Sequence, residues 1–200
     1  MTAHFVQSLF RTTLTDPRAA GQQVIALNLP QNALWLGLML TSIILSLMVS
    51  TLFLASPIPD DELGQMVRMS PAYGAPLMFA LLNWGQAVIT VFILHWVGRA
   101  LGGQGELRDM LAVMIWLQVI SLTLALALFV LGLLFPLLTL VAMTAAFIWG
   151  LWATVALVDA ANRFDNMFKA FGVCVLALVA VSISMTIFSA ILGGASRVGA

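Results

Sequence analysis

Four long stretches of this chain contain no charged side chain, and this spacing limits the fold more than any other feature of the sequence. A helix needs about 20 apolar residues to cross the hydrocarbon core of a bilayer. Each stretch is long enough for one such helix, and the third is long enough for two. The stretches lie between Arg18 and Asp60, between Arg68 and Arg99, between Asp109 and Asp159, and between Lys169 and Arg197.

A short break divides the third stretch near its middle. The segment Gly132-Leu133-Leu134-Phe135-Pro136 contains a glycine and a proline, which stop helices. The sequence therefore predicts an all-α polytopic membrane protein with five transmembrane helices. We place these helices at about 32–55, 75–98, 110–132, 136–158 and 170–193.

The composition excludes several classes of protein. Apolar residues make up 62% of the chain and charged residues 8%, whereas a soluble domain has roughly a quarter charged residues. Eight Lys and Arg balance eight Asp and Glu, so no basic surface exists to neutralise nucleic-acid phosphates. One cysteine, Cys174, and two histidines do not suggest a zinc site. We therefore predict no nucleic-acid partner, no metal site and no cofactor.

The segments outside the predicted helices are too short to fold alone, because domains below about 40 residues usually need disulfides or metals. We divide the chain into an interfacial segment at 1–31, a five-helix transmembrane domain at 32–193 and a short tail at 194–200. Arg11, Asp16 and Arg18 interrupt the start, which a signal peptide would not tolerate, so we expect this segment to be retained.

The first segment has the pattern of an amphipathic helix. Its apolar residues follow helical spacing and alternate with polar ones. A second helix is expected from Pro17, with Thr15 or Asp16 as its cap. Two roles stay open for this segment: a membrane-surface anchor, or a docking helix for a protein partner. The apolar residues are Phe5, Val6, Leu9, Phe10 and Leu14.

Basic residues are distributed unevenly between the two ends of the predicted helices. Such residues resist translocation and collect on the cytoplasmic side. Six lie at the end that carries the N-terminus and two at the other end. We therefore predict a cytoplasmic N-terminus and an external C-terminus. The six are Arg11, Arg18, Arg99, Arg108, Arg163 and Lys169, and the two are Arg68 and Arg197.

Two connections at the predicted cytoplasmic rim contain the remaining candidate residues. The glycine-rich loop at 98–109 lacks a Walker pattern and is typical of a tight turn with positive φ. In the other connection, Asp159 and Arg163 are four residues apart, as are Asp165 and Lys169. That spacing predicts a short interfacial helix. Candidate rim residues are Arg99, Arg108, Asp159, Arg163 and Lys169.

Several polar residues lie at membrane depth. Asn83, Gln86 and Thr90 fall within about 60° on one face of the second predicted span. The third span has Gln118 and Ser121, one turn apart. Two interpretations are open. These side chains either form hydrogen bonds between helices or line a polar path for a small solute.

Nothing in the spans resembles a catalytic centre. No Gly-x-Ser-x-Gly segment occurs, and His95 lies near the end of the second span rather than beside a nucleophile. The acidic residues Asp60, Asp61 and Glu62 follow two prolines in a loop, where they predict a helix start; a weak cation site is the alternative. We expect His95 and Arg99, one turn apart, to extend toward the lipid headgroups.

Three segments resemble the Yip1 family, and specifically its bacterial branch. The segment at 14–20 precedes the first span, the stretch at 101–111 is similar to the family's Gly-Gly-x-Gly turn before the third span, and Ile148-Trp149-Gly150-Leu151-Trp152 resembles its fourth-span pattern. The chain departs from the family in having Gln118 and Val119 where bacterial members often have a proline. The eukaryotic Asp-Leu-Tyr-Gly-Pro segment is also missing.

The resemblance implies a polytopic protein of the bacterial inner membrane without known catalysis. Such a protein would organise membrane or accompany a membrane complex, and it could form homo-oligomers. Because the Asp-Leu-Tyr-Gly-Pro segment is missing, the family's link to small GTPases of the Rab type is not extended to this chain. The alternative function is a small channel or transporter that uses the polar face of the second span.

Reporter fusions test the predicted orientation. A fusion at the N-terminus is expected to report the cytoplasm and a fusion at the C-terminus the opposite side, because five spans place the two ends on opposite faces. A C-terminal fusion that reports the cytoplasm would contradict the five-span arrangement.

Overall fold

The computed structural model describes residues 3–55, 58 and 60–198, and for residues 3, 63 and 184–198 it describes the backbone alone. Regular structure in this part of the chain is entirely helical, which confirms the predicted all-α class. The helices are α1 (Ala3–Thr15), α2 (Pro17–Ala26), α3 (Gln31–Ala55), α4 (Glu62–Met69), α5 (Pro71–Gly74), α6 (Pro76–Ala100), α7 (Leu107–Leu134), α8 (Pro136–Asn162) and α9 (Met167–Val198).

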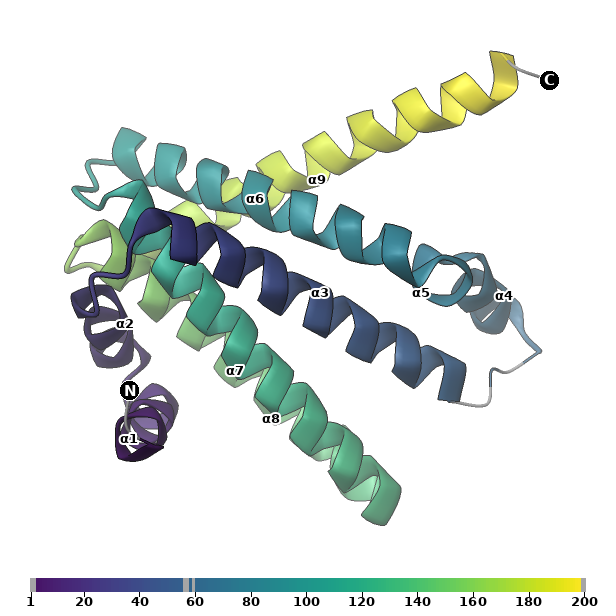
Figure 1. The fold of residues 1–200 in the computed structure, drawn as a ribbon, viewed down its shortest axis with the longest axis horizontal. Coiled ribbons are helices and arrows are strands. Elements are labelled where there is room, and N and C mark those ends of the chain that lie inside the picture. The colour runs from purple at the N-terminus through teal and green to yellow at the C-terminus, as the bar shows by residue number, and fades with distance from the viewer. Residues whose placement is uncertain (1–2, 56–57, 59, 199–200) are drawn as a thin grey trace.

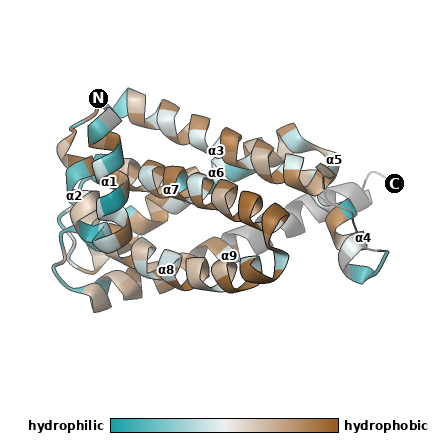
Figure 2. Ribbon diagram, turned by 90° about the horizontal axis from the view of Figure 1, so that it is seen from below, coloured by the Kyte–Doolittle hydropathy of each residue, from teal (hydrophilic) through white to brown (hydrophobic). Residues whose placement is uncertain are grey.

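The long helices lie side by side at one end of the molecule, and α1 and α2 lie beside this end (Figure 1). From this end the α7–α8 hairpin diverges from α3 and α6. Hydrophilic residues gather on α1, α2 and the neighbouring loops, and again at α4 near the other end (Figure 2). The long helices between these two regions are predominantly apolar.

Four helices are long and apolar enough to cross a membrane: α3, α6, α7 and α8. They coincide with the first four predicted spans. The break predicted between the third and fourth spans is confirmed, since α7 ends at Leu134 and α8 begins at Pro136. The fifth predicted span lies in α9, in which Met167–Ile183 is apolar. The backbone of α9 continues to Val198, past the predicted end at residue 193.

Two predicted helix starts are confirmed by side-chain caps. Asp16 accepts a hydrogen bond from the backbone N–H of Ala19, and Pro17 occupies the first turn of α2. Asp61 accepts a hydrogen bond from the backbone N–H of Gly64 at 2.8 Å and so caps α4. Each cap satisfies an N–H group that has no partner within its helix. Pro57 and Pro59, which precede α4, lie outside the described residues.

The prediction of a short interfacial helix between the fourth and fifth spans is wrong. Instead, α8 ends at Asn162, and Arg163 and Asp165 both adopt a left-handed backbone, with φ of 57° and 52°. A left-handed residue interrupts a right-handed helix. Of the four charges at four-residue spacing, Asp159 lies at the end of α8, Arg163 and Asp165 lie in the turn, and Lys169 lies in α9. The first three form ion pairs with residues of other elements.

Packing is concentrated at the end that carries α1 and α2. In α7 the buried residues lie between Asp109 and Ile120, and in α8 they lie between Ala153 and Asn162. The rest of this hairpin has exposed apolar side chains, including Leu133, Phe135 and Leu137. At 1.5 Å per residue α7 is about 42 Å long, which exceeds the hydrocarbon core of about 30 Å. The tightly packed ends can therefore lie at or beyond the membrane interface.

Candidate functional site

The main polar assembly in the described residues lies where α1, α2 and two loops meet the ends of the long helices. We call it the charged rim. It includes the 101–106 loop, the 163–166 loop and two buried carboxylates, Asp109 and Asp159. These residues are only 3% and 1% exposed, so each carboxylate needs a charged or hydrogen-bonding partner.

Asp159 receives its partner from α2. The Nε atom of Arg18 lies 2.7 Å from Oδ2 of Asp159, and the guanidinium also binds the exposed carboxylate of Asp165. The other oxygen of Asp159 accepts a hydrogen bond from the backbone N–H of Asn166 at 3.2 Å. One carboxylate thus fixes α2, the end of α8 and the turn before α9.

Asp109 is satisfied in a similar way at the start of α7. Its Oδ2 atom lies 2.9 Å from Nη2 of Arg163 and accepts a hydrogen bond from the backbone N–H of Glu106. The left-handed backbone of Arg163 lies directly after α8, so this ion pair joins the start of α7 to the end of α8. The sequence suggested that Arg163 would pair with Asp159, and the structure pairs each of them with a different residue.

The glycine-rich loop packs directly against the end of α8. The backbone N–H of Gln104 donates to the carbonyl oxygen of Asn162 at 2.9 Å. A Cβ atom on Gly105 would overlap the carbonyl oxygen of Ala161, so only glycine permits this approach. Gly102 has a φ of 87°, as predicted for a tight turn. The loop is therefore a structural contact between α6, α7 and α8.

Helix α1 is held against the α7–α8 hairpin by two tryptophans. Nε1 of Trp116 donates to Oγ1 of the fully buried Thr13 at 3.0 Å, and Nε1 of Trp149 donates to the carbonyl oxygen of Leu14 at 3.3 Å. The rings of Phe10 and Trp116 have centroids 5.0 Å apart. Tryptophan commonly occupies the membrane interface, because its ring is apolar and its N–H is polar. These contacts fit an α1 that lies along that interface.

The remaining rim candidates do not join this assembly. Arg108 approaches Glu106 at 3.6 Å. Arg99 lines a separate hollow with His95 and Trp96. No ion pair within the described residues involves Arg99 or Lys169. The five rim candidates thus separate into three groups: Asp159 and Arg163, which belong to the assembly; Arg108, which pairs with Glu106; and Arg99 and Lys169, which form no ion pair among the described residues.

The polar residues predicted at membrane depth do not share one environment. Two of its members form hydrogen bonds to α3. Nδ2 of Asn83 donates to Oγ of Ser46 at 2.9 Å, and Nε2 of Gln118 donates to Oγ of Ser42 at 3.0 Å. Thr41 also donates to the side-chain oxygen of Gln118. These bonds fit the interpretation of Asn83 and Gln118 as contacts between helices.

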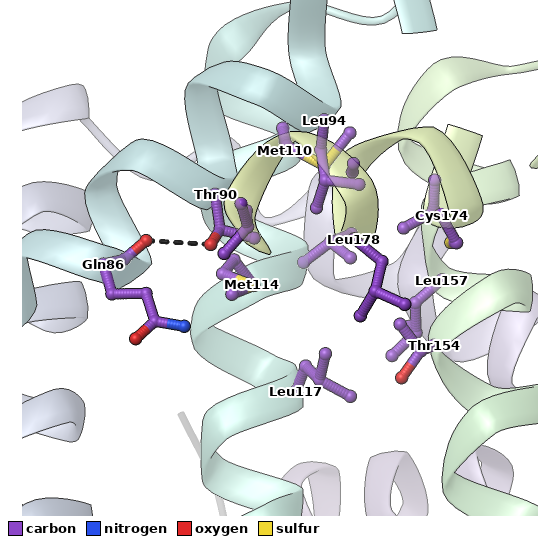
Figure 3. Close-up of a pocket in the computed structure, with 14 residues that line it drawn as sticks. Gln86, Thr90, Leu94, Met110, Met114, Leu117, Thr154, Leu157, Cys174 and Leu178 are labelled. Atoms are coloured by element: carbon purple, nitrogen blue, oxygen red, sulfur yellow. Dashed lines mark hydrogen bonds between the residues drawn. The ribbon is translucent and has the colours of Figure 1, made fainter. Parts of the chain in front are cut away.

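Gln86 and Thr90 instead line an intramembrane cavity of about 320 Å³ between α6, α7, α8 and α9 (Figure 3). The hydroxyl of Thr90 donates to the backbone carbonyl of Gln86 at 2.8 Å. Most of the other lining side chains are apolar. Ser121 lies elsewhere, in a hollow between α7 and α8, where it donates to the carbonyl of Leu117. The five candidates therefore do not form one continuous path.

Sequence reasoning missed several residues that organise the rim. Asp109 and Trp116 were not identified, and Arg18 was identified only as a basic residue of the cytoplasmic side, because their partners are far away in the chain and no local pattern links them. A visible signal did exist for α3, where Ser42, Ser46 and Ser50 recur every fourth residue. All three are buried. Among the described residues, no three His, Cys, Asp or Glu side chains are grouped closely enough to hold a metal ion.

One comparison with known proteins gave a match. A family model described as the Yip1 domain matches residues 11–190. This range extends from within α1 to within α9 and includes the whole charged rim. No curated protein and no solved structure matches the chain.

Replacing Arg18 with alanine tests the main contact of the rim. The change leaves Asp159 buried without its cation, and breaking a fully buried pair costs about 3–5 kcal/mol. Because the Arg18 side chain is 37% exposed, we expect a smaller loss of about 2 kcal/mol in unfolding free energy. Thermal unfolding in mild detergent measures it. A non-specific protease should also cleave faster between α2 and α3.

Arg68→Ala is the matched control. Arg68 pairs with Asp60 at 2.8 Å near the opposite end, and both side chains are exposed. Exposed pairs contribute about 0–1 kcal/mol, so this variant should unfold close to the wild type. Equal small losses in the two variants would show that the buried pair does not hold α2 in place.

Proposed function

The chain belongs to the Yip1 domain family, and from this premise we propose that it is a non-enzymatic membrane protein that organises membrane or accompanies a membrane complex. The observation that supports this role best is the fixed position of α1 and α2. The ion pair between Arg18 and the buried Asp159 holds α2 against the ends of the long helices, and the contacts of Trp116 and Trp149 hold α1 there. The two helices therefore present a surface of fixed position beside the bilayer.

The outer side of this surface is polar and accessible. Polar residues of α1 and α2 point away from the bundle, whereas Leu9, Ala20 and Val24 are buried beneath them. A polar face held in a fixed position is suited to bind another protein, since little conformational entropy is lost on binding. The exposed polar residues include Gln7, Ser8, Arg11, Gln22 and Gln23.

The chain is an integral membrane protein, on the grounds of its apolar helices and its family. We propose the bacterial inner membrane as its location, with α1, α2 and the charged rim in the cytoplasm. The uneven distribution of basic residues supports this orientation. In that arrangement the polar face of α1 and α2 is available to cytoplasmic partners and to the cytoplasmic parts of membrane complexes.

The chemistry of the rim also favours a structural role over catalysis. The two buried carboxylates are each engaged by an arginine and by a backbone N–H group. A general acid or base must instead reach a substrate. We therefore propose that Asp109 and Asp159 maintain the shape of the docking surface.

Photo-crosslinking in native membranes tests partner docking. A photoreactive residue at Gln22 is expected to give a discrete adduct with one partner, which mass spectrometry identifies as another protein or as a second copy of the chain. The same group at Gln65, exposed on α4 near the opposite end, is the matched control and should not give that adduct. Failure to obtain a discrete adduct from Gln22 or Gln23 would contradict docking on this face.

A channel or transporter is the second candidate function, and the cavity beside Gln86 is the observation that favours it. Gln86, Thr90 and Thr154 place polar groups in a cavity of about 320 Å³ within the transmembrane helices. The candidate is weakened by Asn83 and Gln118, whose side chains are used in hydrogen bonds to α3. A solute path would therefore have to pass along Gln86 and Thr90, without the side chains of Asn83 and Gln118.

The double variant Gln86→Leu, Thr90→Val tests this candidate. It removes polar side-chain groups from the cavity without disturbing the bond between Asn83 and Ser46. If the chain transports a small solute, flux in proteoliposomes should fall at least about tenfold, which corresponds to about 1.4 kcal/mol. Ser121→Ala, outside this cavity, is the control. Unchanged flux of every solute that the wild type conducts would eliminate the transport path.

A further inference from the structure

Another hollow lies at the end of α6, beside the glycine-rich loop. It has a volume of about 690 Å³ and lies between the last turns of α6 and the first turn of α7. His95, Trp96 and Arg99 contribute its polar and aromatic side chains, and Ala100 and Leu107 contribute apolar surface. We propose that this hollow binds the phosphate headgroup of an anionic phospholipid. This role requires no protein partner and so goes beyond the docking function proposed above.

The position of the hollow along α6 corresponds to headgroup depth. Trp96 is 75% exposed and lies one turn before the end of a helix long enough to span the bilayer. Exposed tryptophans at span ends mark the boundary between headgroups and acyl chains. Arg99 lies almost one turn further toward the helix end, which places its guanidinium beside lipid phosphates.

The charge of Arg99 is available for a ligand. Its side chain is exposed, and no carboxylate of the described residues lies within ion-pair distance of it. This distinguishes it from Arg18, Arg108 and Arg163, which all pair with carboxylates. Glu106 also lines the hollow, but it is the residue that pairs with Arg108. The hollow therefore contains one cation that forms no ion pair among the described residues, and one carboxylate, whose ion-pair partner is Arg108.

The side chains match the chemistry of a phosphodiester. A guanidinium can donate two parallel hydrogen bonds to phosphate oxygens, and His95, at i,i+4 from Arg99, can donate a further one from its ring. The ring of Trp96 and the side chains of Ala100 and Leu107 offer apolar surface to the glycerol and upper acyl carbons. Phosphatidylglycerol carries a net negative charge that suits this set, whereas the choline group of phosphatidylcholine would place a second cation beside Arg99.

Native mass spectrometry of the full chain in mild detergent tests the site. We expect one phosphatidylglycerol to bind more tightly than phosphatidylcholine. Arg99→Gln should weaken phosphatidylglycerol binding about tenfold, the loss expected when a charge-assisted hydrogen-bonding group is removed. His95→Gln is a second variant and should weaken it by a smaller factor. Both positions are at least partly exposed, so the variants are expected to fold.

Lys169→Gln is the matched control, because it removes the same charge from an exposed position outside the hollow. It should change phosphatidylglycerol binding by less than about twofold. Equal weakening by Lys169→Gln and Arg99→Gln would indicate general attraction to anionic lipid and overturn the site, as would unchanged binding in Arg99→Gln. Inorganic phosphate is added as a competitor. If millimolar phosphate displaces the lipid, the ligand is a soluble phosphate and the lipid assignment is overturned.

Discussion

The ion pair between Arg18 and Asp159 is the contact on which the arrangement of the rim depends. It joins α2 to the end of α8, and through Asn166 it also fixes the turn that leads into α9. A carboxylate that is 1% exposed is costly to bury, so its partners must be present whenever the fold forms. The first two helices are therefore part of the folded bundle and not an appendage, which is why a docking role for their outer face is physically reasonable.

The long helices depend on a different kind of contact. In hydrocarbon there is little hydrophobic gain from bringing apolar helices together, so association depends on close packing and hydrogen bonds. The bonds from Asn83 and Gln118 to serines of α3 serve that purpose. Measured bonds of this type average about 0.6 kcal/mol. Breaking the ion pair between Arg18 and Asp159 is expected to cost more, about 2 kcal/mol, and buried side chains are concentrated at that end.

The rim contains charged side chains that form ion pairs with one another and, close to them, an arginine that forms no ion pair among the described residues. Asp109, Asp159, Arg18 and Arg163 satisfy one another, whereas Arg99 faces an open hollow. This separation accounts for the two proposals. The satisfied group supports a surface that can receive a protein, and the unsatisfied cation can receive a lipid phosphate. Membership in the Yip1 domain family is compatible with both, because the matched region includes all of these residues.

The sequence by itself determined the helical class, four of the long spans, the break at Phe135 and the capped starts at Asp16 and Asp61, because each depends on residues close together in the chain. It did not determine which charges pair. The four-residue spacing of Asp159 and Arg163 predicted a helical contact, and the left-handed backbone at Arg163 redirected that arginine to Asp109. Asn83, Gln86 and Thr90 lie on one face of α6, but their side chains have different surroundings. Asn83 binds Ser46 of α3, whereas Gln86 and Thr90 line a cavity. Only the tertiary structure could decide these partners, because helix packing brings together residues that are distant in sequence.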